Sequence, residues 1–344
     1  MKNIMTILAL AFAASTAAAD YTMVVPQKVG GGTSVWTTIV AAELEKHLGE
    51  KINIDHRPGA RDIPGFDDWH NDLQYDDKTI MVSHGGNGVS FLIENVDYNY
   101  NEYRPIGMMN LDIIVAKRKD ANVLFDKILF SAGSGQTPEG FAIFMMQCGY
   151  ALTQHCWETK VGWVKGMKGG EKRLAFKRGE LNATRESPAA YKKHVGPDEN
   201  AEVWFTHGIA GANGERLDDP EYPGFKFEDV YFKRWGLYPS GPVYDAYALV
   251  RAFRDGLQKA MWVSKDNPNA DKIIAAMEAM VNDPVSMASI NKTAGKYPWV
   301  VGDAAQAHTD AILNLVQEDA LRDLVTIANE QMGLASVYKP ELIK

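Results

Sequence analysis

The stretch VVPQKVGGGTSVWTTIVAAELEKHLG, residues 24–49, places three consecutive glycines between an apolar segment and a helical pattern. Residues 20–25 predict a strand, and residues 34–48 predict a helix. The apolar residues of that helix share one face: Trp36, Ile39, Val40, Leu44 and Leu48. A glycine turn lets backbone N–H groups face a cavity, and the helix N-terminus behind it attracts negative charge. The stretch therefore predicts a strand, an anion-binding turn and a helix.

The same unit of strand, glycine-rich turn and helix occurs three times, with turns at residues 28–34, 83–90 and 131–137. Further predicted strands are residues 51–55, 79–83, 113–116, 128–131 and 180–183, and a further helix is 141–151. The last third is mostly helical, over residues 244–262, 270–281 and 304–328. Strands alternating with helices predict an α/β fold with parallel sheets.

Ligands of open α/β sheets bind at the carboxyl ends of the strands, so the three turns are expected to converge on a small anion. The alternative is that the glycines serve tight turns only. The candidate ligand-binding residues are Gly30, Gly31, Gly32, Thr33, Ser34, Ser83, His84, Gly85, Asn87, Ser131, Gly133, Ser134, Gly135, Thr137 and Arg185.

The chain has 344 residues and a formal net charge of −8, without the basic face of a nucleic-acid-binding protein. Residues 4–14 have the length of a signal-peptide core, and small residues follow up to Ala19. We expect residues 1–19 to be a signal peptide cleaved before Asp20. We then expect the mature protein to be exported and to be a monomer.

Cys148 and Cys156 are eight residues apart. A continuous helix would hold them about 12 Å apart, beyond disulfide reach. A bridge therefore requires the helix to end between them, near Gly149 or Gln154. Both a disulfide and two separate thiols remain open. Neither HExxH nor CxxC occurs, so no metal site or cofactor is expected.

Three catalytic or nucleotide-binding motifs are matched only in part. The stretch 166–173 lacks the Walker spacing, and the dinucleotide pattern GxGxxG has Val35 at its third glycine. His84-Gly85-Gly86 is similar to the oxyanion loop of esterases, but GxSxG is absent. The protein is therefore expected not to be an enzyme. The alternative is an exported serine hydrolase that uses His84, which a serine beside a carboxylate-oriented histidine would support.

Residues 24–60 resemble the opening of the periplasmic solute-binding proteins of tripartite tricarboxylate transporters, the Bug-type family. The family pattern is a strand, PGGGTD, a helix ending in KLG, a strand and NRPGAGG. Further matches follow in order: residues 76–79 for DGYT, 130–135 for SSGxG, 164–181 for YKG…GGQVD and 219–225 near PDVPT.

The resemblance implies a two-lobed flytrap fold with a hinge between the lobes. Lobe 1 would comprise residues 20–112 and 240–344, and lobe 2 residues 117–234. It implies a periplasmic binding protein that captures a small organic carboxylate and delivers it to a tripartite tricarboxylate-type permease. The same fold can instead pass its ligand to a sensor of a two-component system.

This chain differs from the family pattern at two places that bear on which ligand it binds. Ser34 replaces the acid of PGGGTD, and Arg61 and Asp62 replace two glycines. Arg61 is expected to be solvated or paired with Asp62 rather than bound to the ligand, whereas Arg185 can reach the cleft. Trp36 is expected in the core, and Trp235 and Tyr238 either line the cleft or pack the hinge. The basic run 165–178 is expected to be a solvated helix.

Overall fold

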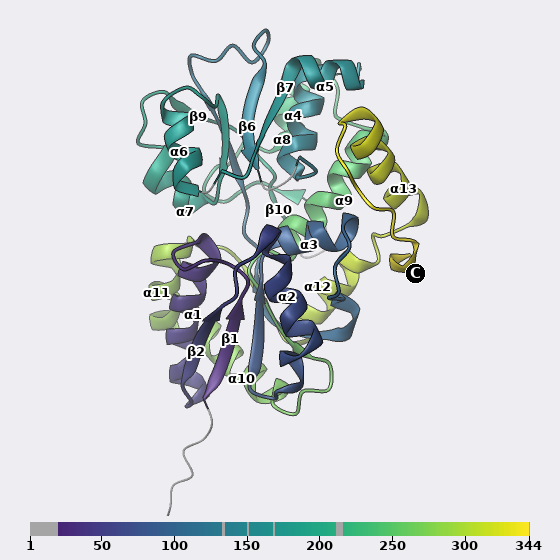
Figure 1. Ribbon diagram of the computed structural model, residues 1–344. Coiled ribbons are helices and arrows are strands. Elements are labelled where there is room, and N and C mark those ends of the chain that lie inside the picture. The colour runs from purple at the N-terminus through teal and green to yellow at the C-terminus, as the bar shows by residue number, and fades with distance from the viewer. Residues whose placement is uncertain (1–19, 133–134, 150, 168, 211–215, 344) are drawn as a thin grey trace, which may run out of the picture.

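The computed structural model describes residues 20–132, 135–149, 151–167, 169–210 and 216–343. The predicted signal peptide therefore lies outside the described residues. Figure 1 shows two bodies, one above the other, joined on one side by helices. No helix among the described residues is both long and apolar enough to cross a bilayer.

The lower body, lobe 1, is built on a six-stranded sheet in the order β13-β4-β12-β3-β1-β2. Its strands are β1 (Tyr21–Val25), β2 (Ile52–His56), β3 (Thr79–Ser83), β4 (Tyr103–Met109), β12 (Ala260–Ser264) and β13 (Trp299–Val301). Strands β2 and β3 pair with β1 in parallel, whereas β12 runs antiparallel to both β3 and β4. The sheet is thus mixed rather than purely parallel, because a late strand inserts at its centre.

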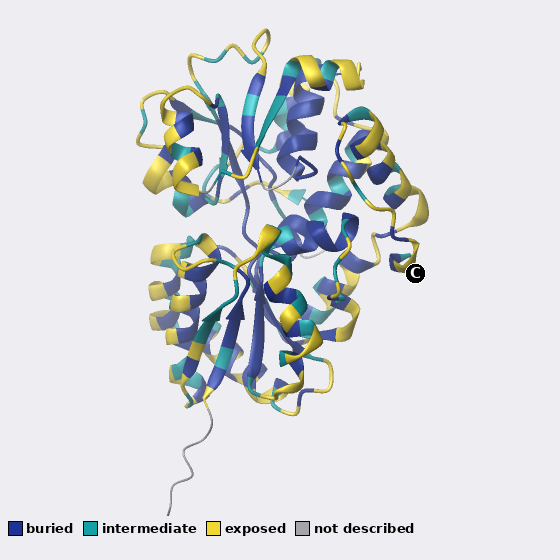
Figure 2. Ribbon diagram, in the orientation of Figure 1, coloured by how far each residue is buried: buried dark blue, intermediate teal, exposed yellow. Residues whose placement is uncertain are grey.

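The helical elements that follow the lobe 1 strands cover both faces of this sheet. They are α1 (Gly32–Leu48), η1 (Ala60–Asp62), α2 (Ile63–Asn71), η2 (Leu73–Tyr75), α3 (Gly85–Ile93), η3 (Tyr100–Glu102), α10 (Ala270–Asn282), α11 (Pro284–Ala294) and α12 (Asp303–Leu313). Trp36 of α1 is 4% exposed and stacks on Trp299, so the predicted core position of Trp36 is confirmed. Figure 2 shows the central strands dark blue and the outer helix faces yellow.

The upper body, lobe 2, contains three small sheets. Its strands are β5 (Ile114–Arg118), β6 (Ile128–Ala132), β7 (Val161–Lys165), β8 (Ala183–Glu186), β9 (Ala201–Thr206), β10 (Ile209–Ala210) and β11 (Arg216–Leu217). Strand β5 lies between β8 and β9, and β6 pairs with β7 in parallel. Its helical elements are α4 (Pro138–Cys148), α5 (Gln154–Lys160), α6 (Gly169–Lys177), α7 (Pro188–Ala190), η4 (Tyr191–Val195) and α8 (Phe227–Trp235).

The basic run is only partly the solvated helix that its sequence predicts. It includes α6, but Lys172 is buried and pairs, together with Arg173, with the carboxylate of Glu186 in β8. Burial lowers the pKa of Lys172, while the two cations hold the pKa of Glu186 below its ordinary value although burial opposes them. The prediction failed because the aliphatic stems and charges of a basic helix can pack against an acidic strand.

Cys148 and Cys156 form a disulfide, with Cα atoms 6.1 Å apart. Helix α4 ends at Cys148, and Gly149 follows it with φ +54°, a backbone region that favours glycine. The helix therefore ends between the two cysteines, as a bridge requires. An added Cβ at Gly149 would also lie 2.9 Å from the ring of Trp235.

The C-terminal part of the chain lies along both bodies. Helix α9 (Pro242–Gly256) contacts both α3 and α4, and α13 (Glu318–Thr326) packs on α9 and continues into η5 (Ile327–Gln331). Beyond η5, Gln136 Nε2 donates to the carbonyl of Ala335 at 2.8 Å. Val337 N–H then donates to the carbonyl of Ile93 at 2.8 Å, before the last turn η6 (Pro340–Leu342). The segment 334–339 thus joins the start of α4 to the end of α3 (Figure 1).

The helix predicted over residues 244–262 is wrong at its C-terminal end. Helix α9 stops at Gly256, and residues 260–264 form β12 between β3 and β4. Trp262, in β12, donates its indole N–H to Ser83 Oγ at 2.8 Å, inside the core. The last three residues of α9 and the three-residue connection to β12, together residues 254–259, are called the junction segment below.

Candidate ligand-binding site

The starts of α1 and α3, two of the predicted loops, contact the junction segment directly. Lys259 Nζ donates to Thr33 Oγ1, in the first turn of α1, at 2.7 Å. Gly85 N–H, at the start of α3, donates to Gln258 Oε1 at 2.7 Å. The first N–H groups of a helix have no acceptor within the helix and carry partial positive charge. The junction segment therefore lies in a region of positive potential.

Lys259 is a buried cation without a counter-ion. The residue is 7% exposed and has φ +55°, which few side chains other than glycine adopt. Among the described residues its amine forms no ion pair with any carboxylate. Burial, reinforced by the neighbouring charge of Arg254, lowers the pKa of Lys259 to about 7. The amine is therefore half-protonated near neutral pH.

Arg254 is the second buried cation of the junction segment. It is 4% exposed, and its Nη1 donates to Gln258 Oε1 at 2.8 Å. Burial, with a contribution from the charge of Arg185, lowers the pKa of Arg254 to about 10. It too forms no ion pair within the described part of the chain. The charges of Glu139 and Asp255 favour the charged form of Arg254, but neither forms an ion pair with it. Because buried charges are normally paired, the two cations are candidates to bind an anion.

The carboxylate of Asp62 lies near Lys259 but is already engaged. His84 Nε2 lies 2.7 Å from Asp62 Oδ2, and Gln27 Nε2 donates to the same oxygen at 3.0 Å. Since His84 Nδ1 accepts from the N–H of Gly86, its Nε2 carries the proton. Burial lowers the pKa of His84, which keeps the ring neutral. Arg61 pairs with Glu94, neither solvated nor bound to Asp62 as its sequence context predicts.

Arg185 brings a third cation from lobe 2. It lies inside β8 rather than after a strand as the sequence predicts, because that strand begins three residues later than predicted. Its Nε lies 2.5 Å from Oε1 of Glu139, in the first turn of α4. Glu139 is 2% exposed, and the charges of both residues act on Arg254. Helix α4 thus reaches the same region through the Glu139–Arg185 pair.

The predicted residues of the first turn are gathered at the start of α1, but several of their N–H groups have acceptors within the protein. Gly30 N–H donates to Ser34 Oγ at 3.2 Å, and Thr33 N–H donates to Gln27 Oε1 at 3.2 Å. Gly31 N–H donates to the carbonyl of Lys28. An added Cβ at Gly32 would meet no atom within 4 Å, so its surroundings are open.

The predicted residues of the second turn hold neighbouring elements in place. Ser83 is fully buried and accepts from Trp262. Asn87 Nδ2 donates to the carbonyl of Asp62 at 3.1 Å, and Asn87 Oδ1 accepts from the N–H of His84 at 3.2 Å. A Cβ added to Gly85 would lie 1.6 Å from the carbonyl oxygen of Arg254, so only glycine fits there. This turn positions Asp62 and the junction segment.

The third turn contributes hydroxyl groups. Ser131 Oγ and Thr137 Oγ1 are buried and have no hydrogen-bond partner in the described part of the chain. Gly135 lies against Leu334, which an added Cβ would approach to 2.5 Å. Gly133 and Ser134, also predicted here, lie outside the described residues. Unpaired buried hydroxyls cost free energy unless water or a ligand binds them, so they are candidate donors.

The arrangement required for a serine hydrolase is not formed by these histidines. Ser34 Oγ lies 3.4 Å from His56 Nε2, but His56 Nδ1 contacts the carbonyl of Gln27, not a carboxylate. His84 has the carboxylate of Asp62, but no serine contacts its ring among the described residues. The two halves of a triad are therefore on different histidines.

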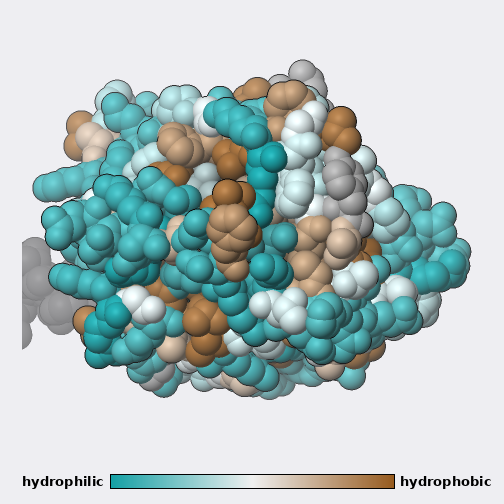
Figure 3. Space-filling model, turned by 90° about the horizontal axis from the view of Figure 1, so that it is seen from above, coloured by the Kyte–Doolittle hydropathy of each residue, from teal (hydrophilic) through white to brown (hydrophobic). Residues whose placement is uncertain are grey.

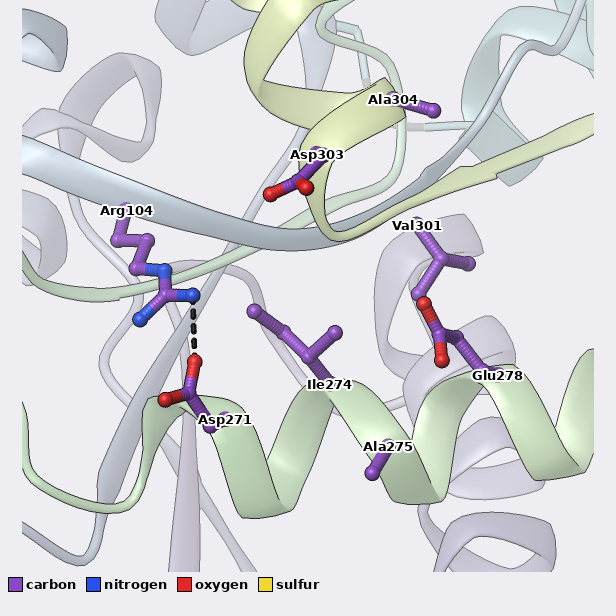
Figure 4. Close-up of a pocket in the computed structure, with 8 residues that line it drawn as sticks. All are labelled: Arg104, Asp271, Ile274, Ala275, Glu278, Val301, Asp303 and Ala304. Carbon is purple, nitrogen blue, oxygen red and sulfur yellow. Dashed lines mark hydrogen bonds and ion pairs between the residues drawn. The ribbon is translucent and has the colours of Figure 1, made fainter.

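A separate cavity of about 440 Å³ lies between α10, α12 and β4. Figure 4 shows Arg104 paired with Asp271 on one side, Asp303 above them, and Glu278 on the opposite side beside Val301. Arg104 is at the start of β4, which runs in the same direction as β3, so the cavity is at the opposite end of the sheet from the junction segment. Among the described residues no His, Cys, Asp or Glu cluster is suited to a metal ion.

Comparison with solved structures places the fold. MatC from Rhodopseudomonas palustris, solved with bound malate, is 16% identical, covers 90% of this chain and 98% of its own, and has a TM-score of 0.56. The periplasmic binding protein BugD is 15% identical over 88% and 95% of the two chains, with a TM-score of 0.56. The chain has the periplasmic-binding-protein fold. Another R. palustris protein, Rpa4515, solved with adipate, is 12% identical over 92% and 98%, with a TM-score of 0.55.

No protein-family model matches the chain, and no curated protein matches it in sequence. The two-lobed α/β architecture predicted from the sequence is confirmed by these structures. The junction segment is not among the site residues that the sequence predicts. A signal was present, since Gly256 interrupts the helical pattern and a strongly apolar run follows Lys259.

The predicted aromatic candidates lie away from this region. Tyr238 is 60% exposed and stacks on Phe232. Trp235 contacts Gly149, at the C-terminal end of α4, about 16 Å along the helix from its first turn. Neither residue therefore lines the region around Lys259, and Trp235 packs on lobe 2.

Proposed function

We propose that this protein is a periplasmic binding protein that captures a small organic carboxylate between its two lobes. The ligand is then delivered to a membrane permease of the tripartite tricarboxylate type. On this proposal residues 1–19 direct export and are removed, residues 20–112 and 240–344 form lobe 1, and residues 117–234 form lobe 2. The mature protein acts as a monomer without a cofactor or a metal ion.

The observation that carries the proposal is the pair of buried cations, Lys259 and Arg254, neither of which forms an ion pair among the described residues. They lie beside the first turns of α1 and α3, where the helix ends add positive potential. A carboxylate would neutralise this charge, and its remaining lone pairs would accept from Ser131, Thr137 and the first N–H groups of α1. MatC and Rpa4515, of the same fold, were solved with malate and adipate.

Arg185 can join the ligand from the other lobe. Its present partner, Glu139, is itself buried, so an incoming carboxylate would compete for the guanidinium. Ligand contacts with both lobes are what drives closure in hinged binding proteins. The predicted glycine-loop residues remain part of this site, with the second turn acting as its support.

The first test is a thermal-shift screen. The chain from Asp20 is unfolded and refolded to remove any carried ligand, and mono-, di-, tri- and aromatic carboxylates are added singly, each beside its neutral amide. A ligand present at a thousand times its Kd stabilises by about 4 kcal/mol, which corresponds to several degrees in Tm. We expect one or two acids to give such a shift and their amides to give none.

Two arginine variants make the screen specific to the site. Arg254→Gln is expected to abolish the shift, whereas Arg104→Gln, in the separate cavity, is expected to keep it. If no acid shifts the refolded wild-type protein, or if acids and amides shift it equally, the carboxylate function is refuted.

A further inference from the structure

The amine of Lys259 has an unusual position for a structural lysine. Its side chain is buried, and within the described residues its one hydrogen bond is to the hydroxyl of Thr33, in the first turn of the 17-residue helix α1. Its backbone lies in the left-handed region, with φ +55°, which is strained for a residue other than glycine. Such strain persists only where the surrounding structure holds it, and it is common at binding sites.

The charged groups around Lys259 do not neutralise it. Arg254 approaches from the end of α9, Arg185 from β8 in the other lobe, and both oppose a positive charge on the amine. Asp62, in η1, favours the charge but already accepts from His84 and Gln27. His84, at the start of α3, is itself buried and neutral. Two more carboxyl groups lie close by: Glu139 pairs with Arg185, and the buried Asp255 acts on Arg254. None of these carboxylates forms an ion pair with the amine of Lys259 among the described residues.

We propose, on the basis of the function above, that Lys259 forms the ion pair with a carboxylate of the ligand and takes up a proton from solvent when it does so. The carboxylate lies between the amine and the first turn of α1, replacing Thr33 as the main acceptor for the amine. Binding then combines one carboxylate, one neutral amine and one proton into an ion pair. Lys259 is thereby the residue that makes affinity depend on pH.

The direction of the pH effect follows from the two states. In the ligand-free protein the pKa of Lys259 is about 7, so at pH 8 most of the amine is neutral. A bound carboxylate favours the charged amine and raises that pKa. Binding at pH 8 should therefore take up close to one proton, and at pH 6 only about a tenth of one. Between the free and the bound pKa the Kd should rise about tenfold per pH unit.

The test is isothermal titration calorimetry on the refolded mature chain, with malate, adipate and the acid that gives the largest thermal shift. Titrations at pH 6 and pH 8 are each run in phosphate and in Tris, whose ionisation enthalpies differ. The difference in observed enthalpy between the two buffers gives the number of protons taken up. We expect that number to approach one at pH 8 and to be small at pH 6.

Three variants separate ligand contact from a structural role. Lys259→Arg keeps a charge that does not titrate, so it should bind without proton uptake and with a Kd that is flat from pH 6 to 9. Lys259→Met should weaken binding at least tenfold at pH 7 and abolish uptake. Lys51→Met, at an exposed lysine of the same lobe, should behave as the wild type.

The outcomes distinguish the two proposals. If the wild type binds an acid without proton uptake at pH 8, or if Lys259→Met binds as tightly as the wild type, the role of Lys259 is refuted while the binding function stands. If the wild type binds none of the acids, the binding function fails and the role of Lys259 fails with it. If Lys259→Met does not fold, Lys259→Arg decides: a Kd that still rises with pH as in the wild type refutes the role of Lys259.

Discussion

Single buried residues in this protein carry a free-energy cost that a bound ligand would reduce. Lys259 is the clearest case, since its pKa falls from an ordinary value of about 10.4 in an unfolded chain to about 7 in the fold. Between these values the unfolded chain binds more protons than the folded one. Stability without ligand should therefore rise with pH from 7 towards 10, by up to about 1.4 kcal/mol per pH unit from this group.

The measurement is urea unfolding of wild type and Lys259→Met, without ligand, at pH 7, 8 and 9. The difference in free energy of unfolding between the two proteins should shift in favour of the wild type as pH rises, because the variant has no amine to discharge. Lys259→Met should also be at least as stable as the wild type at pH 7, since it removes an unpaired buried charge. A pH-independent difference would contradict the lowered pKa.

Gly85 and Gly32 give a second prediction at this scale. At Gly85 an added Cβ would overlap the backbone oxygen of Arg254, whereas at Gly32 it would meet nothing. Gly85→Ala should lower the free energy of unfolding by at least about 2–3 kcal/mol, and Gly32→Ala, at the start of a helix, should change it by less than about 1 kcal/mol. Chemical denaturation of both variants checks this, and equal effects would mean that α3 and the junction segment are not in close contact.

Some residues of the candidate site can be predicted from sequence patterns and others cannot. Glycine turns and the start of α1 are local features, so Gly30–Ser34 could be placed at a helix N-terminus without a structure. Lys259 and Arg254 could not, because their importance depends on the absence of a counter-ion in three dimensions. Arg185 was singled out by its position after a strand, yet its partner Glu139 is 46 residues away in the chain and was not foreseen.

At the scale of elements, the bridge between α4 and α5 is open to direct test. The disulfide closes a short loop, and the chain-entropy account gives it a stabilisation of about 2–3 kcal/mol. Reduction, or the double variant Cys148→Ser/Cys156→Ser, should therefore lower Tm by a few degrees while carboxylate binding is retained, since the bridge is at the far end of α4 from Glu139. Thermal unfolding with and without reductant checks both statements, and loss of binding on reduction would contradict them.

Strands and helices were predicted to within a few residues where one period dominated, as for β3 and α10. The main failure is β12. Its five residues, AMWVS, follow α9 after a three-residue gap, and an apolar run that short fits a buried strand as well as the continuation of a helix. Only its pairing with β3 and β4, about 180 and 155 residues earlier in the chain, decides between them.

For the whole molecule, the two-lobed architecture was inferred from a resemblance and the solved structures of the same fold agree with it. The surface adds a negative observation. On the face seen in Figure 3 hydrophobic residues form small patches separated by hydrophilic ones.

The C-terminal segment sets the direction in which the molecule can open. It is fastened at Gln136 on one lobe and at Phe91 and Ile93 on the other, and α9 and α13 lie along the same flank (Figure 1). Two lobes held together along one side separate most at the opposite side. Solute should therefore enter between α1 and the lobe 2 strands, away from the C-terminal segment. Removal of residues 334–343 should therefore loosen the contact between the lobes before it lowers the stability of either lobe.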